Sequence, residues 1–139
     1  MKKILLILIV IFTGILMFSC NQLRDCSDTD YSDCNTVETK FSNLKVRITI
    51  NSENQIIPIK IYFGNIEDNK LFKSFDTTIS EFQYLLPTNE RFTLAAQYIS
   101  GDDTIVAIDE GYMKTKSQIT CDSICWTLKE DDADLRLKY

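Results

Sequence analysis

Residues 44–63 read LKVRITINSENQIIPIKIYF, and apolar side chains occupy every second position in both halves of this segment. The apolar positions are Leu44, Val46, Ile48 and Ile50, then Ile57, Ile59, Ile61 and Phe63. Successive side chains of a β-strand point to opposite faces, so this period of two predicts two half-buried strands. Because Pro58 lacks the amide donor of a sheet ladder, we expect the second strand to lie at a sheet edge or to be bulged there.

Shorter predicted strands follow along the chain, at residues 71–76, 82–86, 92–98, 105–109, 125–129 and 133–139, and apolar residues alternate in 82–86, 92–98 and 133–139. Turn-forming residues separate them, and no segment has the 3.6-residue period of a helix. The pattern predicts an all-β fold, an antiparallel two-sheet sandwich of about seven to eight strands. A closed barrel of about eight strands is the alternative. We expect the last segment, with Ala133, Leu135, Leu137 and Tyr139 on one face, to pack into a sheet.

The composition of the chain excludes several classes of function. The 139 residues suffice for one domain, and the absence of histidine excludes His-dependent triads, His-ligated metals and imidazole pH sensors. The formal net charge of −5 argues against nucleic acid, which is bound mainly through Lys and Arg. No catalytic residue and no cofactor is therefore predicted.

The N-terminus carries an export pattern. Lys2 and Lys3 precede an apolar run, residues 4–18, which is shorter than the roughly 20 residues that a membrane span needs. The run ends in Leu-Met-Phe-Ser-Cys at residues 16–20, which resembles the lipobox of bacterial lipoproteins. The resemblance implies a signal peptide at residues 1–19, cleavage before Cys20 and a diacylglycerol on Cys20. An ordinary signal peptide and an uncleaved anchor are the alternatives.

The location expected from this resemblance is the outer membrane, because Asn21 is not the aspartate of an inner-membrane retention signal. Either the periplasmic face or the cell surface fits. Loss of residues 1–19 removes two lysines, leaving 13 basic and 20 acidic residues, and changes the net charge from −5 to −7. Such a charge opposes contact with anionic headgroups, so the membrane would be reached through the lipid anchor.

Residues 20–42 are polar and acidic and are predicted to form a lipidated tether ahead of a β-sandwich domain at residues 43–139. Asp28, Asp30 and Asp33 suggest a calcium loop as an alternative. The central glycine and closing glutamate of an EF-hand are missing, so no metal site is predicted.

The cysteines other than Cys20 are Cys26, Cys34, Cys121 and Cys125. An even number in an exported protein predicts two disulfides, and the three possible pairings stay open. A zinc site of four thiolates and a redox-active pair are the alternatives. Seven residues separate the first two cysteines, which fits zinc-ligand spacing poorly, and Asp122 disfavours a thiolate at Cys121.

Two further sets of side chains are candidate sites. Aromatic residues at Tyr62, Tyr84, Tyr98, Tyr112 and Trp126 fit core or cross-strand packing better than an exposed binding strip. Acidic neighbours occur at residues 102–103, 109–110 and 131–132 and fit solvated turns better than a catalytic carboxylate pair.

Four segments of the chain resemble a group of small lipoproteins of Bacteroidota. They are LKVRITINSENQIIPIKIYFGNIEDN (44–69), YLLPTNERFTLAAQY (84–98), CDSICW (121–126) and LRLKY (135–139). The resemblance implies an immunoglobulin-like or transthyretin-like sandwich, and it implies no activity.

The function expected from the sequence is that of a non-enzymatic, membrane-anchored envelope lipoprotein that binds a protein or glycan partner. A lysozyme-inhibitor-like lipoprotein and a carboxylate-dependent glycan hydrolase are the alternatives. An exposed aromatic strip or an unpaired strand edge would favour the binding protein.

Intact mass of the mature protein, with and without reduction, tests these assignments together. We expect a chain that starts at Cys20, carries acyl groups and gains the protons of two reduced disulfides. A mature N-terminus at any other residue would overturn the lipoprotein assignment.

Overall fold

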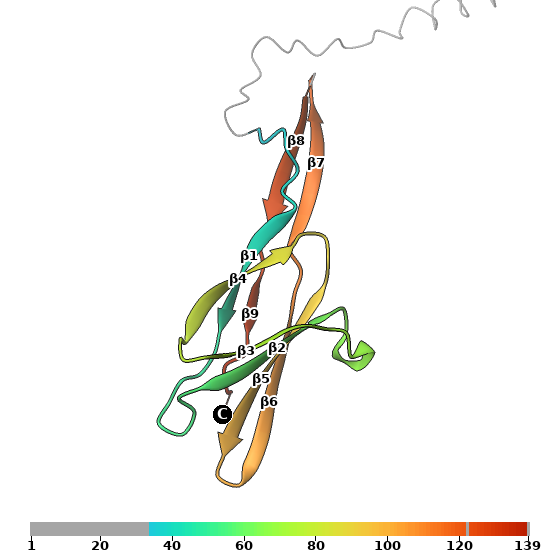
Figure 1. Cartoon of the computed structure of the whole chain (residues 1–139). Coiled ribbons are helices and arrows are strands. Elements are labelled where there is room, and N and C mark those ends of the chain that lie inside the picture. Colours follow the sequence, from blue (N-terminus) through green and yellow to red (C-terminus); the bar gives the residue numbers. More distant parts are fainter. Residues whose placement is uncertain (1–33, 122, 139) are drawn as a thin grey trace, which may run out of the picture. The chain divides into compact units, whose positions relative to one another are not determined.

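The alternating segments form strands throughout the part of the chain that the computed structural model describes, residues 34–121 and 123–138 (Figure 1). The described strands are β1 (Phe41–Arg47), β2 (Ile57–Phe63), β3 (Leu71–Thr77), β4 (Glu81–Pro87), β5 (Phe92–Ser100), β6 (Asp103–Gly111), β7 (Lys114–Thr120), β8 (Ser123–Lys129) and β9 (Asp132–Asp134). One short 3₁₀ turn, η1 (Ile66–Asp68), lies between β2 and β3. The predicted signal peptide, Cys20 and Cys26 lie outside the described residues.

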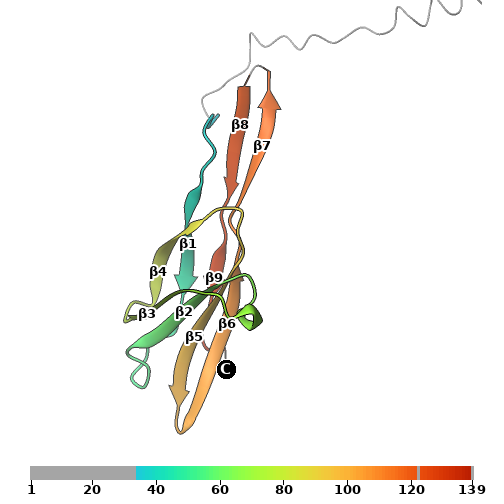
Figure 2. The same cartoon turned by 45° about the vertical axis from the view of Figure 1, so that its right-hand side comes forward.

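The strands form two sheets that share a core, and a separate two-stranded ribbon. One sheet has the order β4-β1-β9, the other has the order β3-β2-β5-β6, and β7 pairs with β8 in the ribbon. All the strand pairs are antiparallel except β1 with β9, which is parallel. The all-β sandwich predicted from the sequence is confirmed. In Figures 1 and 2 the ribbon runs away from the two sheets.

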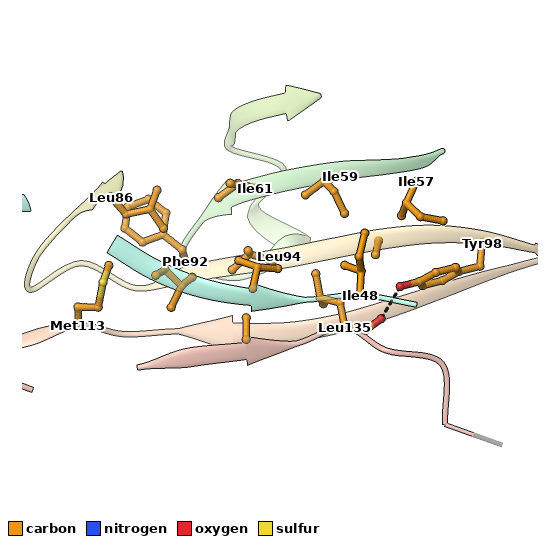
Figure 3. Packing of buried hydrophobic residues seen from close by; sticks show 14 residues of the cluster. Ile48, Ile57, Ile59, Ile61, Leu86, Phe92, Leu94, Tyr98, Met113 and Leu135 are labelled. Carbon is orange, nitrogen blue, oxygen red and sulfur yellow. Dashed lines mark hydrogen bonds between the residues drawn. The ribbon is translucent and has the colours of Figure 1, made fainter. Parts of the chain in front are cut away.

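The core lies between the two sheets and is made of the residues whose alternation predicted the strands. Figure 3 shows it from close by. The buried cluster comprises Leu44, Val46, Ile48, Ile57, Ile59, Ile61, Leu86, Phe92, Leu94, Ala96, Tyr98, Met113, Ala133 and Leu135. Both sheets therefore bury one face against the other, which removes apolar surface from water and stabilises the fold.

Gly111, at the end of β6, allows the sheets to approach closely. A Cβ atom at this position would lie 2.6 Å from Cδ2 of Leu44 on β1. Any larger residue would displace this fully buried leucine, so the glycine is required by packing.

Tyr98 ties three segments together inside the core. Its hydroxyl donates to the carbonyl oxygen of Leu135 over 2.7 Å, and it accepts from the amide of Thr49 over 3.1 Å. The amide of Leu135 donates to the carbonyl oxygen of Arg47 over 2.8 Å. The buried tyrosine thus satisfies backbone groups of the C-terminal segment and of the segment after β1.

The C-terminal segment is packed on the core, although its strand is shorter than predicted. The strand β9 ends at Asp134. Beyond it Leu135 is fully buried and Leu137 packs against the core. Tyr139, predicted to close the strand, lies outside the described residues.

One local prediction was wrong, and one strand was missed. The strand β2 is not at an edge, because β3 and β5 flank it. Pro58 is tolerated because the pairing with β5 begins one residue later, at Ile59, and the irregularity of β2 lies between Ile61 and Tyr62. The strand β7 was not predicted, because its sequence KTKSQIT lacks alternating apolar residues; its strand conformation comes from pairing with β8.

We expect Tyr98→Phe to lower the free energy of unfolding by roughly 1–3 kcal/mol, because a buried carbonyl and amide lose their partner. Denaturant unfolding measures this change. Tyr112→Phe, at a partly exposed tyrosine, is the control. Equal stability of the Tyr98→Phe variant and the unmodified protein would contradict this role of the hydroxyl.

Candidate binding edge of the four-stranded sheet

The strand β6 lies at one edge of the four-stranded sheet. All of its nine residues pair with β5, from Asp103 opposite Ser100 to Gly111 opposite Phe92. Within the described ranges β5 is its only strand partner. The outer side of β6 therefore carries backbone groups that no neighbouring strand pairs.

The exposed apolar side chains of β6 are its most unusual feature. Residues 105–108 read Ile-Val-Ala-Ile, so apolar side chains point to both faces of the strand. Ile105, Val106 and Ile108 are 41%, 50% and 53% exposed. Edge strands usually carry charges, proline or bulges that prevent pairing with other chains. The centre of β6 carries none of these, which marks it as a candidate binding edge.

The core-facing side of this edge borders a hollow of about 280 Å³. Its lining residues are Ile105, Ala107, Ile108, Asp134, Arg136, Leu137 and Lys138. The hollow thus lies between β6 and the C-terminal segment, and both walls contribute apolar side chains.

Two contacts fix the C-terminal wall of this hollow. Arg136 donates to both carboxylate oxygens of Asp134, from Nε over 2.7 Å and from Nη2 over 2.9 Å. This bidentate contact holds the pKa of Asp134 well below its ordinary value. The backbone amide of Asp134 donates to Oδ2 of Asp109 on β6 over 2.7 Å.

The opposite face of the same sheet carries two further hollows beside β6. One, of about 200 Å³, is lined by Pro58, Lys60, Tyr62, Ile66, Ala95, Gln97 and Val106. The other, of about 500 Å³, is lined by Asn65, Ile66, Glu67, Thr93, Ile108, Asp109 and Glu110. Ile66 of η1 borders both, and Thr93 helps to position that loop by donating from Oγ1 to the carbonyl oxygen of Gly64 over 2.6 Å.

No protein-family model, no curated protein and no solved structure matches this chain. The edge is therefore interpreted from its own geometry. Sequence reasoning did not single out β6, although it named an unpaired strand edge as support for a binding function. The available signal was the unbroken apolar run at residues 105–108, which differs from the alternation at residues 44–63.

The carboxylates of β6 do not form a catalytic pair. Asp109 and Glu110 lie within the strand, not in a turn as predicted, so their side chains point to opposite faces. Both oxygens of Asp109 accept backbone amides, of Glu110 over 2.9 Å and of Asp134 over 2.7 Å. Asp109 therefore has a structural role, joining β6 to β9.

The other acidic neighbours are also accounted for. Asp102 lies in the turn before β6, where Asp103 begins the strand. Asp131 accepts the amide of Tyr112 over 2.8 Å, and Asp132 pairs with Arg47.

Among residues 34–121 and 123–138 no group of three or more Asp, Glu or Cys side chains is arranged to hold a metal ion. The same residues contain no helix long and apolar enough to cross a membrane.

The cysteines join distant parts of the chain. Cys34 and Cys125 form a disulfide with a Cα–Cα distance of 4.9 Å across 91 residues of sequence. Cys121 is disulfide-bonded too, and Cys26 lies outside the described residues. Local pairing of Cys121 with Cys125 is thereby excluded. Sulfurs bonded to each other also supply no thiolate for the zinc site that the sequence left as an alternative.

The described end of the predicted tether is attached to the domain. Asn35 forms a β-bridge with Trp126 of β8, next to the disulfide. Glu38 accepts from Oγ1 of Thr115 over 2.9 Å, and the carbonyl oxygen of Thr39 accepts from Oγ1 of Thr88 over 2.6 Å. These contacts extend the folded part of the chain to residues before β1.

The aromatic residues singled out in the sequence do not form one strip. Tyr98 and Tyr62 are buried on β5 and β2. On β4, Tyr84 stacks on Phe75 with the ring centroids 5.3 Å apart. The guanidinium carbon of Arg91 lies 5.4 Å from the ring centre of Tyr112, and Trp126 is on the ribbon. Packing accounts for Tyr98, Tyr62 and Tyr84, as predicted.

Peptide mapping of the unreduced protein is expected to recover Cys34 linked to Cys125. Of the three pairings among four cysteines, this bond is compatible only with the one that joins Cys26 to Cys121, so a second linked peptide with those residues is predicted. Recovery of a peptide that links Cys121 to Cys125 would contradict the arrangement of the ribbon.

Proposed function

We propose that this protein is a membrane-anchored cell-envelope lipoprotein without enzymatic activity that binds a protein partner through β6. The observation that carries the proposal is the exposed apolar edge at Ile105, Val106 and Ile108, which hollows border on both faces of the sheet. Such an edge offers backbone hydrogen bonds and apolar contacts at once, which are the two requirements of protein binding by strand addition.

The anchoring part of the proposal rests on the sequence at residues 16–20. The Ser-Cys pair at the end of a short apolar run fits cleavage before Cys20 and attachment of a diacylglycerol. One acyl chain gives only marginal membrane binding, whereas the several chains of a lipoprotein make the attachment lasting. Export would also place the disulfide-bonded cysteines in an oxidising compartment.

A non-enzymatic role is supported by what the acidic residues do. General acid-base chemistry by carboxylates needs two groups that face each other across a cleft with different pKa values. Asp109 and Asp131 instead accept backbone amides, and Asp132 and Asp134 pair with arginines. These four carboxylates thus hold strands and loops in place through their hydrogen bonds and ion pairs.

A protein partner is favoured over a glycan. Sugar binding by stacking needs aromatic rings on one accessible face. The described aromatic side chains that are at least partly exposed are divided among several strands, such as Phe41 on β1, Phe72 on β3 and Trp126 on β8, and β6 carries none. The side chains exposed on β6 are aliphatic, and an aliphatic edge fits another polypeptide better.

Site-specific photo-crosslinking in intact cells tests the proposed function. A photoreactive residue in place of Val106 is expected to give one reproducible protein adduct. The same residue in place of Ile119, which is 73% exposed on the ribbon, is the matched control and should not give that adduct. Identical adducts at both positions, or none at Val106, would contradict binding at β6.

A further inference from the structure

We infer that the partner contributes an extended strand to the edge of β6, and that this strand is apolar in its centre and carries Lys or Arg at both ends. The inference rests on the proposed function and specifies the chemistry of its ligand. Accessible backbone, hollow volume and charge around β6 each support it.

The accessible part of the edge begins at Asp103 and ends at Ile108. The side chain of the next residue, Asp109, accepts the backbone amide of Asp134, so the C-terminal segment is attached to β6 at this point. A strand rises by about 3.3 Å per residue, so these six residues offer roughly 20 Å of edge. This length suits one short strand.

Side chains of an added strand would alternate between two apolar surfaces. On one face they would enter the hollow of about 280 Å³ beside Ile105, Ala107 and Leu137. On the other face they would lie beside Val106 and Ile108, which border the hollows on the outer side of the sheet. An apolar centre therefore suits both faces of the added strand.

Acidic residues stand at both ends of this edge. Asp102 and Asp103 precede the apolar run, and Asp109 and Glu110 follow it. Among these four residues one described ion pair occurs, between Glu110 and Arg91 at 3.9 Å. Both side chains are exposed, so the arginine offsets the negative charge of Glu110 only weakly. In the C-terminal segment Arg136 is paired with Asp134, so the basic groups that remain near the edge are Lys138 there and Lys60 in the hollow beside Val106. Lys or Arg at the ends of the added strand would complement the acidic ends of the edge, and Glu or Asp there would be repelled.

A second copy of the chain fits this edge less well. Antiparallel pairing of two β6 strands about Val106 would place Asp103 of each copy opposite Asp109 of the other. Both sites would then hold two like charges side by side, which is unfavourable in a sheet. The charge pattern therefore favours a basic strand from a different protein.

Binding of labelled peptides to the full mature protein in detergent tests the inference. The probes are KVTVTVTK, the acidic-ended EVTVTVTE, and KVTPTVTK, whose central proline cannot take part in a ladder. Fluorescence anisotropy is expected to give at least tenfold tighter binding of the first peptide than of either other. Its affinity should fall as salt is added. Hydrogen exchange should slow at residues 103–108 in the complex.

Three variants locate the site. Val106→Lys places a charge on the edge and should weaken binding at least tenfold, whereas Ile119→Lys on the ribbon is the matched control and should not change it. Asp103→Lys should reduce the preference for basic ends.

Equal binding of the acidic-ended or proline peptide, equal affinity of the Val106→Lys variant, or no slowing of exchange at residues 103–108 would overturn the inference. So would a protein dimer that Val106→Lys dissociates in sedimentation. These failures are distinguishable from failure of the proposed function, because a crosslinked partner at Val106 without strand addition would keep the binding function and refute this mode of binding.

Discussion

The packing of β1 against the four-stranded sheet is the interaction on which the rest of the structure depends. β1 is the central strand of its sheet, and its side chains Leu44 and Val46 are fully buried. It pairs with β4 on one side and with β9 on the other, and the absence of a side chain at Gly111 gives Leu44 its space. The backbone after β1 also receives the C-terminal segment, through Tyr98 and Leu135. A substitution that disturbs the packing of β1 would therefore destabilise both sheets.

The unequal size of the two sheets explains why β6 has an unpaired edge. The four-stranded sheet is wider, and β9, which lies closest to β6 from the other sheet, has only three residues against nine. The backbone amide of Asp134 at the end of β9 contacts the side chain of Asp109, and the residues after β9 line the hollow beside Ile105 and Ala107 without pairing with β6. The edge of β6 therefore stays unpaired although the C-terminal segment lies beside it.

The sequence predicted the parts of the fold that depend on local pattern. Alternation at residues 44–63 and 92–98 identified the core strands, because burial of one face imposes a period of two. It did not identify β7, whose stability comes from pairing with β8, nor the interior position of Pro58, which depends on the order of strands in the sheet. The Cys34–Cys125 bond and the edge position of β6 were also beyond prediction, because both depend on which distant segments become neighbours. The candidate site is a property of strand order, and residue type alone does not reveal strand order.

The acidic residues around β6 oppose the self-association that its apolar centre would otherwise promote. An uncharged apolar edge pairs readily with other edges, including those of identical copies, and so promotes aggregation. Acidic residues at both ends of the run, on a chain with a formal net charge of −5, make self-pairing unfavourable while leaving the centre accessible. The same charges would attract the strand with basic ends that we propose as the partner, so one feature would disfavour self-pairing and favour that partner. We therefore propose that Asp102, Asp103, Asp109 and Glu110, besides their structural contacts, determine which strand can bind at this edge.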